Sequence, residues 1–149
     1  MKCWTACGLL LALFSQGTAG GQLSIEAAAS KYIPAVNWRI NSVVVGDFSC
    51  RGRTEQAILG ISASEIIVAV FLNGTSQRPE VIRDSARSAA SIMLTTEGLD
   101  FDPKEDLGYI LPGFQRSKTC KGLDLSDDQI DSRHIYWNRE LHRFDSWSL

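Results

Sequence analysis

VVVGDFSCRGRTEQAILGISASEIIVAVFLNGT, residues 43–75, contains two consecutive runs that favour β-strands. Branched and apolar side chains fill residues 55–61 and 65–72, and runs of this length are typical of strands in a sandwich core or buried on both faces. Only three small residues, 62–64, separate the runs, and the pair 73–74, Asn-Gly, gives a strong turn signal after them. The stretch therefore predicts a buried β-hairpin.

Outside this stretch the chain has one helix signal and several more β-type runs. Residues 23–32, with Ser24 as a cap and Pro34 as a stop, predict a short helix. Residues 98–113 contain prolines, glycines and acidic residues and predict a long surface loop. Further strands are expected at residues 40–47, 81–83, 91–96 and 119–125, with 87–90 open to a helix, and a second hairpin at 133–137 and 141–147.

These patterns predict a mainly β fold. We expect an antiparallel sandwich or curled sheet of about seven to eight short strands, with one short N-terminal helix. The length of 149 residues fits a single domain.

The C-terminal hairpin turns about residues 138–140. If Asn138 pairs with Leu141, His134 lies opposite Asp145 on the neighbouring strand. A slip of one residue would change every pair while leaving the hairpin intact. His134 beside Asp145 would be an oriented general base, although cross-strand charge pairs also occur without catalysis.

The first 19 residues have the pattern of an export signal. Lys2 gives a positive start, residues 7–14 form a short apolar core, and residues 17–19 are small enough for cleavage. The alternative is a buried N-terminal strand or helix. We expect a mature domain at residues 20–149 that is periplasmic or secreted, without membrane insertion, because the apolar run is far below the ~20 residues of a spanning helix.

The cysteines that remain after such a cleavage are Cys50 and Cys120. Two cysteines in an oxidising compartment most simply form one disulfide. The alternative is a catalytic or redox thiol, but no Cys-x-x-Cys occurs and neither cysteine has a histidine beside it in sequence. We therefore predict a Cys50–Cys120 bond.

The charge of the chain argues against nucleic acid as a partner. The formal net charge is −2, and loss of Lys2 would make it −3, with no basic block anywhere in the sequence. This mildly acidic surface leaves another protein outside the cytoplasm as the expected partner.

Residues 45–60, followed by Val70-Phe71-Leu72-Asn73-Gly74, resemble the FG-GAP/VCBS repeat of integrin-like β-propellers. The resemblance covers about residues 43–75 and rests on Gly46-Asp47-Phe48, on Gly52 and on the closing Asn-Gly. It implies a strand, an acidic calcium-binding loop and two further strands. A whole propeller is not expected, since propellers need at least about four blades and a second copy of the motif does not occur.

The loop departs from the calcium-binding pattern of that family. Asp47 is retained, but Ser49 is a weaker ligand and Arg51 stands where an acid is required. Calcium takes about 6–8 oxygen ligands, several of them anionic, and a guanidinium opposes it. Glu55 stands at the closing position, where it is equally able to pair with Arg51 or Arg53. We expect no cofactor and no metal here, and Cys50 in place of the ion as the element that fixes the hairpin.

The candidate binding residues lie in the acidic loop and among the C-terminal aromatic side chains. The expected contacts are Asp102, Asp106 and Tyr109 in the loop, with Tyr136 and Trp147 as interface anchors if they are exposed. No motif of a serine hydrolase, zinc protease, phosphate loop or dinucleotide site occurs.

The leading hypothesis is an exported binding protein, an inhibitor or immunity-type factor for an enzyme outside the cytoplasm, with no catalytic residues of its own. A rigid disulfide-tied scaffold and an acidic loop would suit a basic target. The alternatives are an envelope structural or adhesion module related to FG-GAP repeats, and a small secreted hydrolase that uses His134.

Overall fold

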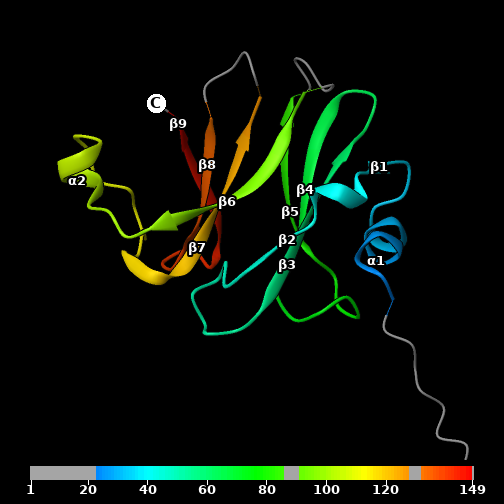
Figure 1. The fold of residues 1–149 in the computed structure, drawn as a ribbon, viewed down its shortest axis with the longest axis horizontal. Helices are drawn as coiled ribbons and strands as arrows, with labels where there is room; N and C mark the ends of the chain where they lie inside the picture. Colours follow the sequence, from blue (N-terminus) through cyan, green and yellow to red (C-terminus); the bar gives the residue numbers. More distant parts are fainter. Residues whose placement is uncertain (1–22, 86–90, 128–131, 149) are drawn as a thin grey trace, which may run out of the picture.

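The computed structural model describes residues 23–85, 91–127 and 132–148, which fold into two antiparallel β-sheets with two short helices (Figure 1). The predicted export signal and the possible helix at 87–90 lie outside these ranges. The mainly β class is confirmed, with nine strands in the described ranges, two of which have only two or three residues. Among the same residues no helix is long and apolar enough to cross a membrane.

The first sheet contains the predicted hairpin, β3 (Glu55–Ile61) with β4 (Glu65–Phe71). Their antiparallel register pairs Ile58 with Ala69. The other strands of this sheet are β1 (Asn37–Trp38), β2 (Val44–Gly46) and β5 (Glu80–Ser85), and the order is β1-β3-β4-β5, with β2 also paired to β3. Of the strand predicted at 40–47, only β2 forms; Ile40–Ser42 is a 3₁₀-helix, η1.

The second sheet has the order β6-β7-β8-β9. Its strands are β6 (Met93–Leu99), β7 (Ser117–Ser126), β8 (Arg133–Asn138) and β9 (Arg143–Ser148). Each strand pairs antiparallel with the next strand along the chain. The sheet is therefore a simple meander, which needs only local connections.

The two sheets pack face to face around one core. Its buried side chains include Phe48, Leu59 and Val68 beside the first sheet and Leu123 and Ile135 from the second. Helix α1 (Ile25–Tyr32) covers the other face of the first sheet, where Ala28 and Ala29 are fully buried. The predicted helix cap is confirmed, since Ser24 Oγ accepts from the amide of Ala27 at 3.2 Å.

Residues 100–116, here called the covering segment, lie on the outer face of the second sheet, the face turned away from the first sheet (Figure 1). The segment contains helix α2 (Pro103–Asp106), a short helix within the residues predicted as a loop. Its cluster with the sheet contains Leu99, Leu111, Cys120, Tyr136 and Trp147, with Cys50, Phe101, Leu107 and Phe114 packed against it. The molecule is thus layered as α1, first sheet, second sheet and covering segment.

The disulfide predicted between Cys50 and Cys120 is present. It joins the loop after β2 to β7, with the two Cα atoms 5.1 Å apart and 70 residues apart in sequence. Lys121 N also donates to the carbonyl of Asp47 at 3.0 Å, so a backbone hydrogen bond lies beside the covalent link. Both contacts hold the first sheet against the second.

The register predicted for the C-terminal hairpin is wrong by two residues. Asn138 pairs with Arg143, and His134 lies opposite Trp147 instead of Asp145. The turn is longer than predicted because the side chain of Asn138 accepts from the amides of Glu140 and Leu141, both at 3.0 Å. A shift of two residues keeps each side chain on its predicted face.

Candidate functional site

The outer face of the second sheet carries a polar cluster beside the covering segment. Four neighbouring strands each contribute one member: Glu97 from β6, Asp124 from β7, His134 from β8 and Trp147 from β9. The pairings Asp124 with His134 and His134 with Trp147 set three of them in one row across the sheet. Sheet register, and not sequence proximity, therefore assembles the cluster.

Glu97 reaches His134 across β7 because Gly122 lies between them. Glu97 pairs with Gly122, and a Cβ at this glycine would lie 3.0 Å from both Cγ and Oε1 of the glutamate. The open position lets Glu97 Oε2 approach to 2.8 Å from His134 Nδ1. A Cβ at this position would also lie 2.9 Å from Leu99 Cδ2, so the absence of a side chain leaves room for the carboxylate.

The surroundings of the pair shape its chemistry. The Trp147 ring stacks on the imidazole with centroids 4.8 Å apart, and Asp124 Oδ1 lies 3.9 Å from His134 Nδ1. Burial raises the pKa of Glu97, an effect that the hydrogen bond from His134 partly offsets. When Nδ1 carries the proton, the ring offers Nε2 as an acceptor, which is the arrangement of an oriented base.

The general base expected from His134 and Asp145 is not formed. Asp145 instead accepts hydrogen bonds from Asn138 Nδ2 at 3.3 Å and from the amide of Ser146 at 2.9 Å. The two-residue shift of the hairpin register separates the expected pair. Glu97 is the acid that orients His134, and the sequence analysis missed it because the contact spans 37 residues and skips a strand.

The covering segment is held on the sheet at its C-terminal end. Tyr136 Oη donates to the carbonyl of Pro112 at 2.8 Å, and Arg139 N donates to the carbonyl of Gly113 at 3.0 Å. Burial, with smaller contributions from Asp145 and other nearby groups, raises the pKa of Tyr136 to about 12. This hydroxyl therefore remains a donor at any physiological pH.

Tyr136 and Trp147 are not surface anchors. They are 2% and 7% exposed, and both pack with the phenylalanine rings of the covering segment. Exposed apolar side chains lie instead at Tyr109 and Ile110 in the segment and at Leu141 in the adjacent turn. Ile110, at 74%, is the most exposed large hydrophobic residue among those described.

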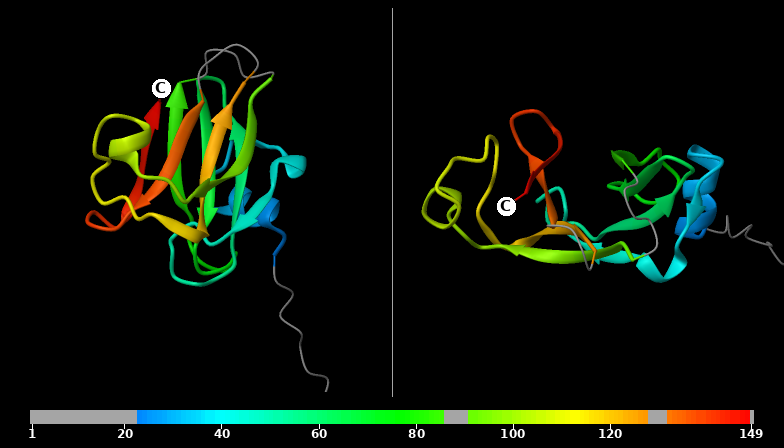
Figure 2. Two further views of the ribbon diagram at one scale, coloured as in Figure 1. Left: turned by 60° about the vertical axis from the view of Figure 1, so that its left-hand side comes forward. Right: turned by 90° about the horizontal axis from the view of Figure 1, so that it is seen from above.

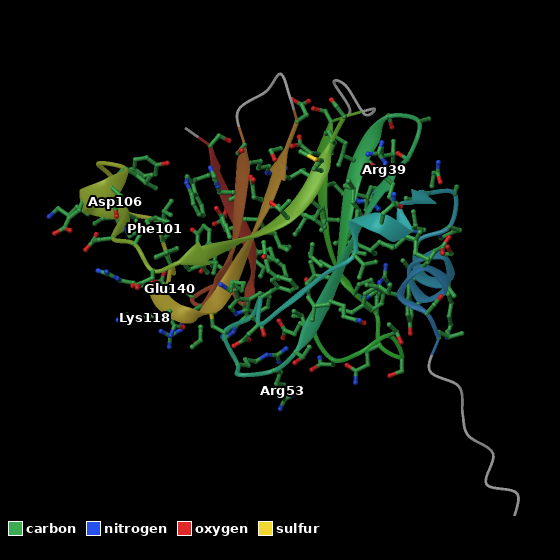
Figure 3. The ribbon with its side chains drawn as sticks, in the orientation of Figure 1. Arg39, Arg53, Phe101, Asp106, Lys118 and Glu140 are labelled. Atoms are coloured by element: carbon green, nitrogen blue, oxygen red, sulfur yellow. A yellow bond between two sulfur atoms is a disulfide. The ribbon has the colours of Figure 1, made fainter. Side chains whose placement is uncertain are left out.

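Asp102 and Asp106 stabilise helix α2 from within. Asp102 Oδ1 accepts from the amide of Lys104 at 2.9 Å, and Asp106 Oδ2 accepts from the amide of Asp102 at 2.9 Å. Figure 3 shows Asp106 at the outer end of the segment and Phe101 on its inner side. The Asp-Pro sequence at 102–103, a cap followed by proline at the first helical position, was the signal for this helix.

In the loop between β2 and β3, Arg51 contacts the carboxylate of Glu55. Glu55 is buried, accepts from the amide of Ser49 at 2.8 Å, and lies 3.2 Å from Arg51 Nη2. Asp47 accepts from the amides of Arg51 and Gly52 at 2.9 and 2.8 Å. In the described part of the chain no group of three or more His, Cys, Asp or Glu side chains is placed to hold a metal ion.

Comparison with models of known protein families, with curated proteins and with solved structures found no match to this chain. The site must therefore be interpreted from its own geometry.

Proposed function

We propose that this protein is an exported binding protein that attaches to a basic protein outside the cytoplasm and masks it, in the manner of an inhibitor or immunity-type factor. The observation that carries the proposal is the exposed apolar pair Tyr109 and Ile110 on the covering segment, together with exposed Leu141 in the β8–β9 turn to which the segment is hydrogen-bonded. Exposed aromatic and aliphatic residues that cluster on one surface are typical of protein interaction sites.

The rigidity of this surface supports binding. The aromatic rings of the covering segment pack on the second sheet, with Phe101 5.6 Å from Trp147 and Phe114 5.6 Å from Tyr136 between ring centroids. The segment is also hydrogen-bonded to the β8–β9 turn through Gly113. A segment fixed before association loses less conformational entropy when it binds. The exposed side chains are therefore presented at low entropic cost.

The charge of the segment supports a basic partner. The covering segment, residues 100–116, contains four carboxylates against one lysine and one arginine, a net charge of −2 that equals the net charge of the whole chain. Glu105 and Asp106 are exposed on α2, and Glu140 is exposed beside Leu141. Acidic groups around an apolar centre favour approach to a positively charged surface. Cell-wall hydrolases often have such a basic surface.

The test begins with affinity capture from the native host's envelope fraction by the protein from residue 20 onward. A stoichiometric partner is then purified, and its affinity and enzymatic activity are measured with variants. We expect Ile110→Ala to weaken the complex by about 30-fold, as for a residue at the centre of an interface. Ile40→Ala is the matched control, because Ile40 is 64% exposed on η1, away from the covering segment.

Charge reversal should be made at Glu105 instead of Asp102 or Asp106, whose carboxylates are needed by α2. Glu105→Lys should lower the association rate and the salt dependence of binding. Equal affinity of the Ile110 and Ile40 variants for the partner would contradict the proposed function. A partner whose enzymatic activity is unchanged on binding would contradict it as well.

A further inference from the structure

The polar cluster of the outer face has more carboxylate oxygens than hydrogen-bond donors aimed at them. Glu97 Oε2 takes the hydrogen bond of His134 Nδ1, and Asp124 Oδ2 accepts from Ser126 Oγ at 3.3 Å. In the described structure, Glu97 Oε1 and Asp124 Oδ1 are both buried and accept no hydrogen bond. A buried carboxylate oxygen without a donor is costly, and a proton on the carboxyl group removes that cost. The geometry therefore favours a protonated cluster.

The net charge of the cluster depends on how many protons it holds. Both carboxylates approach His134 Nδ1, Glu97 to 2.8 Å and Asp124 to 3.9 Å, so an imidazolium compensates one of their two negative charges. A protonated carboxyl group removes the other. Burial raises the pKa of Glu97, the hydrogen bond and charge of His134 lower it, and the charge of Asp124 raises it. Because histidine changes its charge between about pH 5 and 8, acidification over this range moves the cluster toward zero net charge.

The other titratable groups of this face are satisfied elsewhere. Tyr136 of β8 donates a hydrogen bond to the covering segment, and Asp145 of β9 accepts from a backbone amide. In the covering segment, Asp100 and Arg116 pair with each other at 2.8 Å, and the charged residues of α2 cap the helix or are exposed. Within the described ranges, His134 forms ion pairs with the two carboxylates of the cluster and with no other residue. Its charge is therefore linked chiefly to these two acids.

Trp147 links the cluster to the covering segment. Its indole lies over the His134 imidazole with 18° between the ring planes, and the Phe101 ring packs against it with centroids 5.6 Å apart. A cation within about 6 Å of an indole face is attracted to it, so an imidazolium holds Trp147 more firmly than a neutral ring does. The view from above in Figure 2 shows the segment, in yellow, beside β8 and β9 at the end of the molecule opposite α1. Attachment of its N-terminal part thus depends on the charge of the cluster.

We propose that proton uptake by the polar cluster locks the N-terminal part of the covering segment onto the second sheet. The charges of the cluster are then compensated, and Trp147 stacks on an imidazolium. Because the locked form holds protons that the unlocked form releases, acidification favours the locked form and a rise in pH weakens it. The inference rests on the proposed function only for its consequence, which is that Tyr109 and Ile110 are presented most firmly in mildly acidic surroundings.

Amide hydrogen exchange of the intact protein at about pH 5 and about pH 8, corrected for the intrinsic pH dependence of exchange, measures the lock. The amides of Asp106 and Leu107 are hydrogen-bonded to carbonyls within the segment and report its opening. We expect protection at least about tenfold greater at the lower pH, as for one proton linked to opening. The nitrogen chemical shifts of the His134 ring should change with the same midpoint, whereas the amides of β3 and β4 should keep their protection.

Two substitutions should flatten the pH profile at opposite levels. Glu97→Gln removes one negative charge but keeps an acceptor for His134, so the segment should stay protected at the higher pH. His134→Gln cannot take up a proton, so protection at the lower pH should fall to the level that the natural protein has at the higher pH. His142→Asn is the control and should keep the full change. His142 is the other histidine of the chain, is exposed, and has a φ of 51° that asparagine tolerates.

Equal protection of the segment at both pH values in the natural protein would overturn the proposal. A pH change that survives in both the Glu97 and the His134 variants would overturn it as well, as would titration of the His134 ring with no change in the segment. These measurements need no partner, so the lock and the proposed function can fail separately. If the segment does not respond to pH while Ile110→Ala still weakens a captured complex, the lock is wrong and the proposed function stands.

Discussion

Arg51 and Glu55 form an ion pair in the loop between β2 and β3. Arg51 Nη2 lies 3.2 Å from Glu55 Oε1, and Arg51 Nε donates to Ser49 Oγ at 2.8 Å. The Glu55 side chain is fully buried, whereas that of Arg51 is 41% exposed. A buried carboxylate needs a positive or hydrogen-bonding partner, and here the chain supplies both from residues 49–51.

Arg51→Ala should destabilise the protein by about 1–3 kcal/mol, because it leaves the buried Glu55 carboxylate without its cation. The loss should fall below the 3–5 kcal/mol typical of a wholly buried pair, since the arginine is partly solvated. Urea unfolding measures the change. Arg53→Ala, two residues away and exposed, should change stability by less than about 0.5 kcal/mol; equal effects of the two variants would contradict this role.

Calcium at millimolar concentration should leave the thermal unfolding midpoint unchanged. The carboxylate of Asp47 already accepts two backbone amides, and the guanidinium of Arg51 opposes a cation beside Glu55. Scanning calorimetry with calcium and with a chelator makes the comparison. A calcium-dependent rise in the midpoint would instead favour the adhesion-module alternative.

Removal of the disulfide by Cys50→Ser with Cys120→Ser should lower the free energy of unfolding by about 4 kcal/mol. The estimate follows from the chain-entropy model for two cysteines 70 residues apart. Reductant should reproduce the loss in the natural protein and have no further effect on the double variant. Unfolding curves that are insensitive to reductant would contradict a stabilising role for the bond.

The sequence predicted those parts of the fold that depend on local patterns. The β3–β4 hairpin forms at the predicted residues because two uninterrupted apolar runs flank a short connection. The disulfide was predictable because only two cysteines remain after the predicted signal. The β8–β9 register was not predictable. A longer turn, in which the Asn138 side chain accepts a backbone hydrogen bond and His142 has a φ of 51°, forms instead of the shorter predicted turn.

The polar cluster of the outer face could not be predicted from sequence patterns. The strands of Glu97 and His134 are separated by β7. The two side chains make contact across β7 because Gly122, which pairs with Glu97, has no side chain to block them. The apolar surface was missed for a similar reason. Tyr136 and Trp147 are aromatic residues in an alternating strand, and the pattern does not reveal that the covering segment buries their face.

The stability contribution of Glu97 should change with pH in a defined direction. Burial raises its pKa in the folded state, so folding favours the protonated acid. Its favourable contribution is present below the unfolded pKa of about 4.3 and is lost as pH rises through the raised folded value. Glu97→Gln should therefore gain stability relative to the natural protein as pH increases from about 4 toward 7.

Urea unfolding across this pH range measures the difference between the two proteins. Glu140→Gln is the control, since Glu140 is exposed in the β8–β9 turn, and its stability should follow the natural protein at every pH. A constant difference between Glu97→Gln and the natural protein would contradict the effect of burial.

Gly113 fixes the covering segment to the β8–β9 turn. Its φ is 65°, and a Cβ at this position would lie 2.0 Å from Asn138 Oδ1, the atom that organises the turn. Gly113→Ala should therefore combine backbone strain with a steric clash and destabilise the protein by about 2–4 kcal/mol. Urea unfolding measures the loss, and amide exchange should increase in the segment and the turn.

Gly108→Ala separates the two contributions. Gly108 has a φ of 80°, but a Cβ there would meet no atom within 4 Å, so the substitution introduces the strain without the clash. It should cost about 1–2 kcal/mol and leave exchange in the β8–β9 turn unchanged. If both alanine variants lost the same stability, the contact between Gly113 and Asn138 would not be what holds the segment in place, and the binding surface would not be pre-organised by this contact.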